Sequence, residues 1–138
     1  MTQDTSRLEV AEMPISVLSV LKPGTGLQMD PEPLGDIYRS LGPEAAERAV
    51  CRTLEDVALR LSRLFDLKAA SAWSSMGEVA RRTARVAEQI GLTEVARAAR
   101  HVGVTADQGD GVALEATLAR LERAYDMALA EIWDFQNL

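Results

Sequence analysis

From residue 30 onward, apolar residues recur every three or four positions, which is the spacing of one face of an α-helix. In a short first segment, Asp30 suits an N-cap, Pro31 suits the first helical turn and Gly42 suits the end. A longer helix is predicted to begin at Pro43. Its apolar stripe consists of Val50, Leu54, Val57, Leu61 and Leu64.

Two similar amphipathic segments occupy the middle of the chain. The first is predicted to begin at about Ser71–Ser75 and to run to Ile90, with Gly91 at its end, and Ser75 and Glu78 could form a capping box. Its expected inward residues are Met76, Val79, Thr83, Val86 and Ile90. The second segment carries Leu92, Val95, Ala99 and Val102. It is expected to end near His101, so that "TADQGDG" (105–111) forms a loop.

A last helix is predicted from about Asp110, with the stripe Leu114, Leu118, Leu121, Tyr125, Ala128 and Ile132. Long helices with single apolar stripes and short joints bury those stripes best side by side. The predicted fold is therefore all-α: an antiparallel up-and-down four-helix bundle over residues 29–138, with the short helix 30–41 added at one end.

Residues 1–28 differ from the rest because they combine prolines and glycines with the β-prone run "ISVLSVL". We expect an extended N-terminal arm, whose apolar content argues against a fully disordered tail. Such an arm could pair across a homodimer.

Composition excludes several classes of function. A net charge of −6 disfavours general nucleic-acid binding and anionic membrane surfaces. No apolar run approaches the ~20 residues that span a bilayer, and the N-terminus does not read as a signal peptide. The single cysteine, Cys51, fits a reducing compartment, so a cytoplasmic location is expected.

Signals for catalysis, metals or cofactors are weak. His101 is the only histidine, and at a helix C-terminal turn it is typical of a surface or capping residue. No Glu-x-x-His pair suggests a metal site in the bundle, so no metal or cofactor and no enzymatic activity are expected. Cys51 is expected to be a small buried residue, and Trp73 and Trp133 are expected to be packing residues. The acidic runs at 107–110 and 131–134 lack calcium-loop spacing and favour solvated surface.

A basic helix face is the most informative feature. Arg81, Arg82 and Arg85 lie opposite the apolar positions of their helix, and Arg97 with Arg100 adds to them on the next helix. One interpretation is a solvated face on which glutamates at 78, 88 and 94 pair with the arginines. The other is a docking patch for an acidic partner.

The layout of residues 29–132 resembles the histidine phosphotransfer (HPt) domains of bacterial two-component phosphorelays. "DPEPLGDIYRSLGPEAAERAV" resembles their opening helices, "SMGEVARRTARVAEQIGLTEVARAARHV" their central hairpin and "LEATLARLERAYDMALAEI" their closing helix. In that family the hairpin reads His-x-Leu-Lys-Gly-Ser/Ala, with a further glycine ten residues after the histidine. When Gly91 is taken as that glycine, Arg81 occupies the position of the phosphorylated histidine.

The other motif positions also depart from the family pattern. The lysine falls on Ala84, the glycine on Arg85 and the small residue on Val86. Arginine stays protonated and is not a nucleophile, so Arg81 cannot accept phosphate. The resemblance therefore implies a degenerate, non-catalytic signalling module. Its partner would be a receiver domain or a histidine kinase, bound through Arg81, Arg82, Arg85 and Arg97.

Two alternatives stay open at this point. One is a structural or dimerisation module without a link to a phosphorelay. The other is active phosphotransfer through His101, although "HVGVTAD" has neither the lysine nor the glycine at the family spacing.

Overall fold

The computed structural model describes residues 29–136, and this part of the chain is all-helical, without strands. The helices are α2 (Pro31–Leu41), α3 (Pro43–Ala69), α4 (Trp73–Glu88), α5 (Thr93–Gln108) and α6 (Gly111–Gln136). The predicted N-terminal arm and its pairing across a dimer lie outside the described residues.

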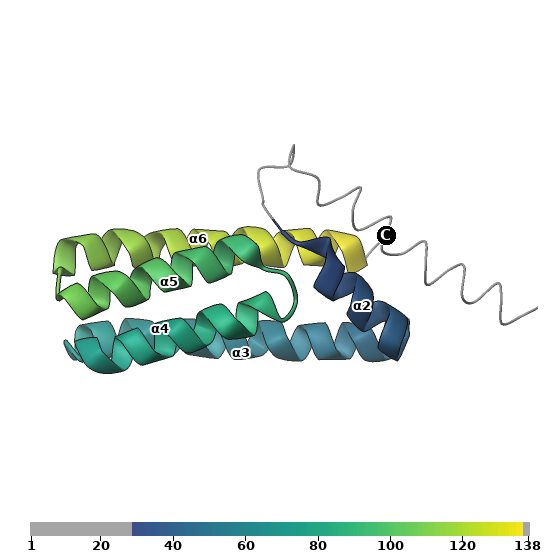
Figure 1. The fold of residues 1–138 in the computed structure, drawn as a ribbon, viewed down its shortest axis with the longest axis horizontal. Coiled ribbons are helices and arrows are strands. Elements are labelled where there is room, and N and C mark those ends of the chain that lie inside the picture. The colour runs from purple at the N-terminus through teal and green to yellow at the C-terminus, as the bar shows by residue number, and fades with distance from the viewer. Residues whose placement is uncertain (1–28, 137–138) are drawn as a thin grey trace, which may run out of the picture.

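The four longer helices lie lengthwise beside one another, and α2 lies across one end of them (Figure 1). The joints at 70–72, 89–92 and 109–110 are short, so each helix runs back along its predecessor. Contacts are most extensive between α4 and α5, followed by α5 with α6 and α3 with α4. By contrast, α3 and α6 make few close backbone contacts.

The first helix begins as its sequence predicts. A side-chain oxygen of Asp30 accepts a hydrogen bond from the backbone N–H of Glu32 at 3.0 Å, and Pro31 occupies the first turn. The backbone N–H of Asp30 donates to the carbonyl of Gly91 at 2.9 Å, which joins the start of α2 to the joint between α4 and α5. Gly91 adopts a φ of +77°, a conformation that favours glycine.

Helix α4 begins within the predicted range of 71–75, but the predicted capping box is wrong. The helix begins at Trp73 with Ala72 as its N-cap, and no side chain caps it. Ser75 and Glu78 do not form a capping box, because both residues already lie within the first two turns of the helix. The capping pattern in the sequence therefore marks helical turns but not the helix end.

The predicted loop at 105–111 is also wrong. Helix α5 continues to Gln108, and only Gly109 and Asp110 join it to α6. Thr105 fits within the helix because its hydroxyl donates to the backbone carbonyl of His101 at 3.1 Å. Gly109 then ends the helix in the left-handed conformation, with a φ of +68°.

The predicted stripes of α3 and α6 form much of the core. All five stripe positions of α3 are buried, and on α6 Tyr125 alone of the predicted stripe is only half-buried. On α4 the inward face is rotated from the prediction, since Val79 and Val86 are only half-buried. The buried positions of α4 are Met76, Gly77, Ala80, Thr83, Ala84 and Ala87. These mostly small residues let α4 lie close against α5, which explains the extensive contact between the two helices.

Two further expectations about single residues are wrong. Cys51 is exposed rather than buried, although it directly follows the buried Val50 on α3. Trp133 is 66% exposed, whereas Trp73 packs against the core as predicted. Within residues 29–136, no helix has the length and apolarity needed to cross a membrane.

Candidate functional site: a basic hollow between α3 and α4

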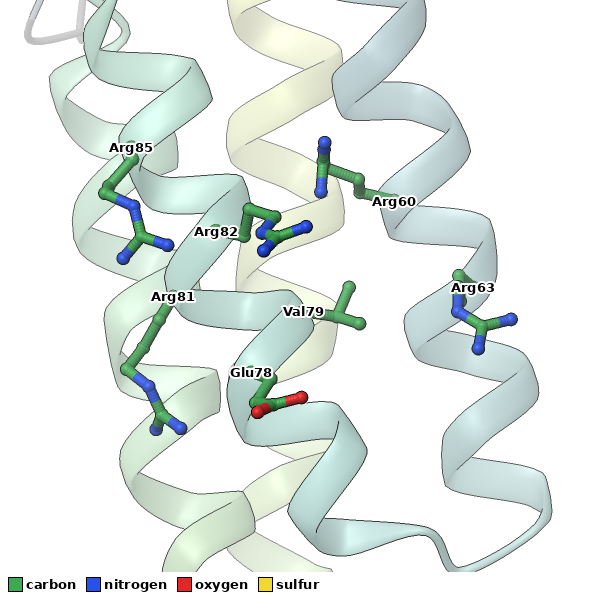
Figure 2. A pocket seen from close by; sticks show the side chains of 7 residues that line it. All are labelled: Arg60, Arg63, Glu78, Val79, Arg81, Arg82 and Arg85. Carbon is green, nitrogen blue, oxygen red and sulfur yellow. The ribbon is translucent and has the colours of Figure 1, made fainter.

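The arginines of α4 and two arginines of α3 line the same open hollow, which has a volume of about 480 Å³. We call it the basic hollow. Its lining consists of Arg60, Arg63, Glu78, Val79, Arg81, Arg82 and Arg85 (Figure 2).

The helical periodicity of α3 and α4 builds this site. On α3, the buried stripe that includes Leu61 and Leu64 turns Arg60 and Arg63 toward the outer surface. On α4, burial of the alanine-rich face leaves the arginines and Val79 on the other side (Figure 2). Because α3 and α4 pack against each other, the two basic faces border the same hollow.

The positive charge of the hollow is only partly compensated. Arg60 pairs with Asp56 on its own helix at 2.9 Å, and Arg81 pairs with Asp107 on α5 at 2.9 Å. The remaining lining arginines, Arg63, Arg82 and Arg85, have no ion-pair partner among residues 29–136. In a chain of net charge −6, this is a local reversal of sign.

The structure thus brings three of the four predicted binding residues into one site, namely Arg81, Arg82 and Arg85. The fourth, Arg97, lies on α5 outside the hollow and pairs with Glu94 at 2.9 Å. Arg100 similarly pairs with Glu88 of α4. The solvated-face interpretation therefore describes these two α5 arginines well, and a binding role for Arg97 stays a prediction.

Sequence reasoning missed Arg60 and Arg63. They lie three positions apart on the polar side of α3, so the sequence does place them on one face. Which face of α4 they meet depends on how the α3–α4 hairpin packs, and no local pattern contains that information.

His101 is exposed on α5, which continues well beyond it to Gln108. The expectation of a histidine at the C-terminal turn is therefore wrong. Among the residues described by the structure, no group of histidine, cysteine and carboxylate side chains has the arrangement of a metal site.

No protein-family model, curated protein or solved structure matches the chain.

Proposed function

We propose that this protein is a degenerate, non-catalytic relative of histidine phosphotransfer domains that binds an acidic partner through the basic hollow. In this proposal, helices α3–α6 form the antiparallel four-helix bundle of that family, with α2 as an additional helix at one end. The partner is a receiver domain or a histidine kinase of a phosphorelay. The observation that carries the proposal is the set of arginines around one hollow, three of which lack ion-pair partners in the described part.

The chemistry of the hollow suits carboxylates. Each guanidinium is planar and always charged, and it can donate two parallel hydrogen bonds to one carboxylate. Arg82 and Arg85 extend from a well-packed helix, so their backbone positions are already set before a partner binds. A receiver domain presents acidic residues around its phosphoacceptor aspartate, which is the complementary charge. The acidic remainder of this chain would repel the same surface and so favour approach at the hollow.

The register with the phosphotransfer family also supports binding without transfer. Arg81 takes the place of the nucleophilic histidine, and its guanidinium is held by Asp107. Arg85 takes the place of the glycine that gives a receiver room to approach, and it lines the hollow. A partner would therefore rest on charged side chains and exchange no phosphoryl group with them.

The test is the affinity of purified receiver domains encoded by the two-component genes nearest to this gene. We expect Arg82→Ala/Arg85→Ala to weaken binding about tenfold, since two partly exposed charge contacts are lost. The matched control is Arg120→Ala/Arg123→Ala, which removes two exposed charges from α6. Equal affinities of the α4 variant and the unaltered protein for a receiver that binds would disprove docking at the hollow.

A second candidate function is phosphotransfer through His101. The observation that favours it is that this imidazole is exposed on the body of α5 and not at a fraying end. Incubation with a labelled phospho-receiver should then produce acid-labile label that disappears in His101→Ala. An absence of label on the unaltered protein, or label that persists in the variant, would exclude this activity.

A further inference from the structure

A second hollow, separate from the basic one, lies where α3 and α6 make few contacts. We call it the apolar groove, and it has a volume of about 290 Å³. Its lining consists of Cys51, Leu54, Glu55, Ala58, Tyr125, Leu129, Ile132 and Trp133. Leu129 is 42% exposed and Trp133 is 66% exposed, so large apolar side chains border the groove without being covered by the helices. Apolar side chains that line a groove between two helices offer a surface on which another apolar segment can pack.

The charge around the groove restricts what can cover it. Glu55 is the one charged residue of the lining, and Asp126 follows the lining residue Tyr125. The pKa of the Tyr125 hydroxyl is raised, first by burial and then by the negative charges of Asp126 and Glu55. A second copy placed face to face on this groove would bring those acidic groups together, and like charges oppose such pairing.

The chain itself contains a complementary segment. Residues 15–21 read "ISVLSVL", an uncharged and mainly apolar run, and Lys22 follows it directly. The run offers apolar side chains for the groove, and the lysine offers a positive charge for its acidic edge.

The segment is also attached at the end of the molecule toward which the groove extends. Helix α2 lies at the end of the molecule where α3 begins and α6 ends (Figure 1). The groove is built from residues 51–58, around the middle of α3, and residues 125–133, in the second half of α6, so on α6 it lies toward that same end. Residues 22–28 connect the run to Met29, which packs against the core, and seven residues can span up to about 24 Å.

We propose that residues 15–21 of the same chain occupy the apolar groove, with Lys22 facing Glu55. The connection through residues 22–28 makes binding intramolecular. A short tether of this kind supplies an effective concentration in the millimolar range, so even a weak apolar contact keeps the segment bound in the groove. The inference is independent of the proposed function, because the groove and the basic hollow share no lining residue.

The only cysteine of the chain reports on the groove directly, because Cys51 is part of its lining. The experiment is the rate at which an uncharged aromatic disulfide modifies Cys51 in the full-length protein. The test variant is Leu18→Asn/Leu21→Asn, and the matched control is Ser16→Asn/Ser19→Asn, which changes the polar positions of the same run. These substitutions lie outside helices α2–α6, and circular dichroism verifies that the helices persist in each variant.

We expect the leucine variant to be modified roughly fivefold faster than both the unaltered protein and the serine control, because the segment no longer covers the thiol. The rate in the unaltered protein should not depend on protein concentration. Equal rates in all three proteins would overturn the proposal. Protection that grows with protein concentration and persists in the leucine variant would also overturn it, and would assign the groove to a second copy of the chain.

Discussion

The guanidinium of Arg81 on α4 lies 2.9 Å from the carboxylate of Asp107 on α5, beside a glycine that makes room for the pair. A Cβ atom at Gly77 would lie 2.4 Å from a carboxylate oxygen of Asp107, so a larger residue would displace this side chain. Both partners are about half exposed, and such a pair contributes only about 0–1 kcal/mol to stability. Its larger effect is on the basic hollow, where it neutralises one of the lining arginines.

Removal of that neutralisation should strengthen partner binding. In Asp107→Asn the guanidinium of Arg81 loses its counter-charge and becomes available to an acidic partner. We expect affinity for a receiver domain to rise about twofold to fivefold, the range that one exposed ion pair supports. Titration calorimetry measures this. Asp36→Asn is the control, because it frees Arg39 on α2, away from the hollow. A decrease in affinity in Asp107→Asn would show that Arg81 is not a binding residue.

The contribution of α3 to the hollow predicts a role for Arg63, which has no ion-pair partner among the described residues. Arg63→Ala should weaken receiver binding about threefold and make it less sensitive to salt, because one screened charge contact is lost. Affinity measured at several salt concentrations gives both values. Arg123→Ala on α6 should change neither, since it does not line the hollow. If Arg63→Ala behaves like that control, the binding surface does not include α3.

Because of Tyr125, the free energy of unfolding is expected to fall at alkaline pH. Its hydroxyl donates to the backbone carbonyl of Leu54 at 3.0 Å, and burial together with Asp126 and Glu55 raises its pKa. The folded state therefore favours the neutral phenol. The stabilisation is present below the unfolded pKa of about 10 and is lost as the pH rises through the folded pKa.

Tyr125→Phe removes both the hydrogen bond and the titrating group. We expect a loss of about 1 kcal/mol in the free energy of unfolding at pH 7, and a smaller decline between pH 9 and pH 11 than in the unaltered protein. Urea unfolding at each pH measures this. Parallel pH profiles for the two proteins would show that Tyr125 is not the source of the alkaline decline.

The sequence predicted the elements of the fold better than their mutual orientation. The stripes that include Val57 and Leu121 are buried as predicted, because side chains spaced three or four apart on a helix share a face. On α4 the same rule selected Val79 and Val86, yet the buried face runs through Ala80 and Ala84. Alanine is only slightly apolar, so it contributes little to a sequence pattern of hydrophobic residues. These alanines are buried because their small side chains let α4 pack closely against α5, and the sequence of α4 alone does not specify that packing.

In the basic hollow, too, the residues of a single helix were predictable from the sequence and the packing of two helices was not. Three arginines of one helix were visible in the sequence because they are close together on one face, and the structure finds all three in the lining. Arg60 joins them only through the packing of α3 against α4. The end of α5 was misplaced for a different reason. Residues 105–111 are rich in residues that favour turns, but the left-handed Gly109 and one following residue are enough to reverse the chain.

The contact between Gly91 and Asp30 gives the sharpest prediction about stability. Gly91 has a φ of +77°, and a Cβ atom there would lie 2.0 Å from the backbone carbonyl oxygen of Asp30. Backbone cannot rotate away as a side-chain end can, so Gly91→Ala must shift α2 or the joint between α4 and α5. The matched control is Gly109→Ala, at a φ of +68° with no atom within 4 Å of the added Cβ.

Both substitutions place alanine in a left-handed conformation, which costs about 1–2 kcal/mol. Only Gly91→Ala adds the clash with Asp30, and overpacking of this kind costs about 1–3 kcal/mol more. We therefore expect a loss of roughly 2–5 kcal/mol in the free energy of unfolding for Gly91→Ala and about 1–2 kcal/mol for Gly109→Ala. Urea unfolding measures both values.

The difference between them isolates the contact, because the strain common to the two sites cancels. Equal losses would mean that α2 is not held against the joint through Asp30. A larger loss in Gly91→Ala would show that this backbone contact fixes α2, whose buried Leu34 and Tyr38 complete the core at that end.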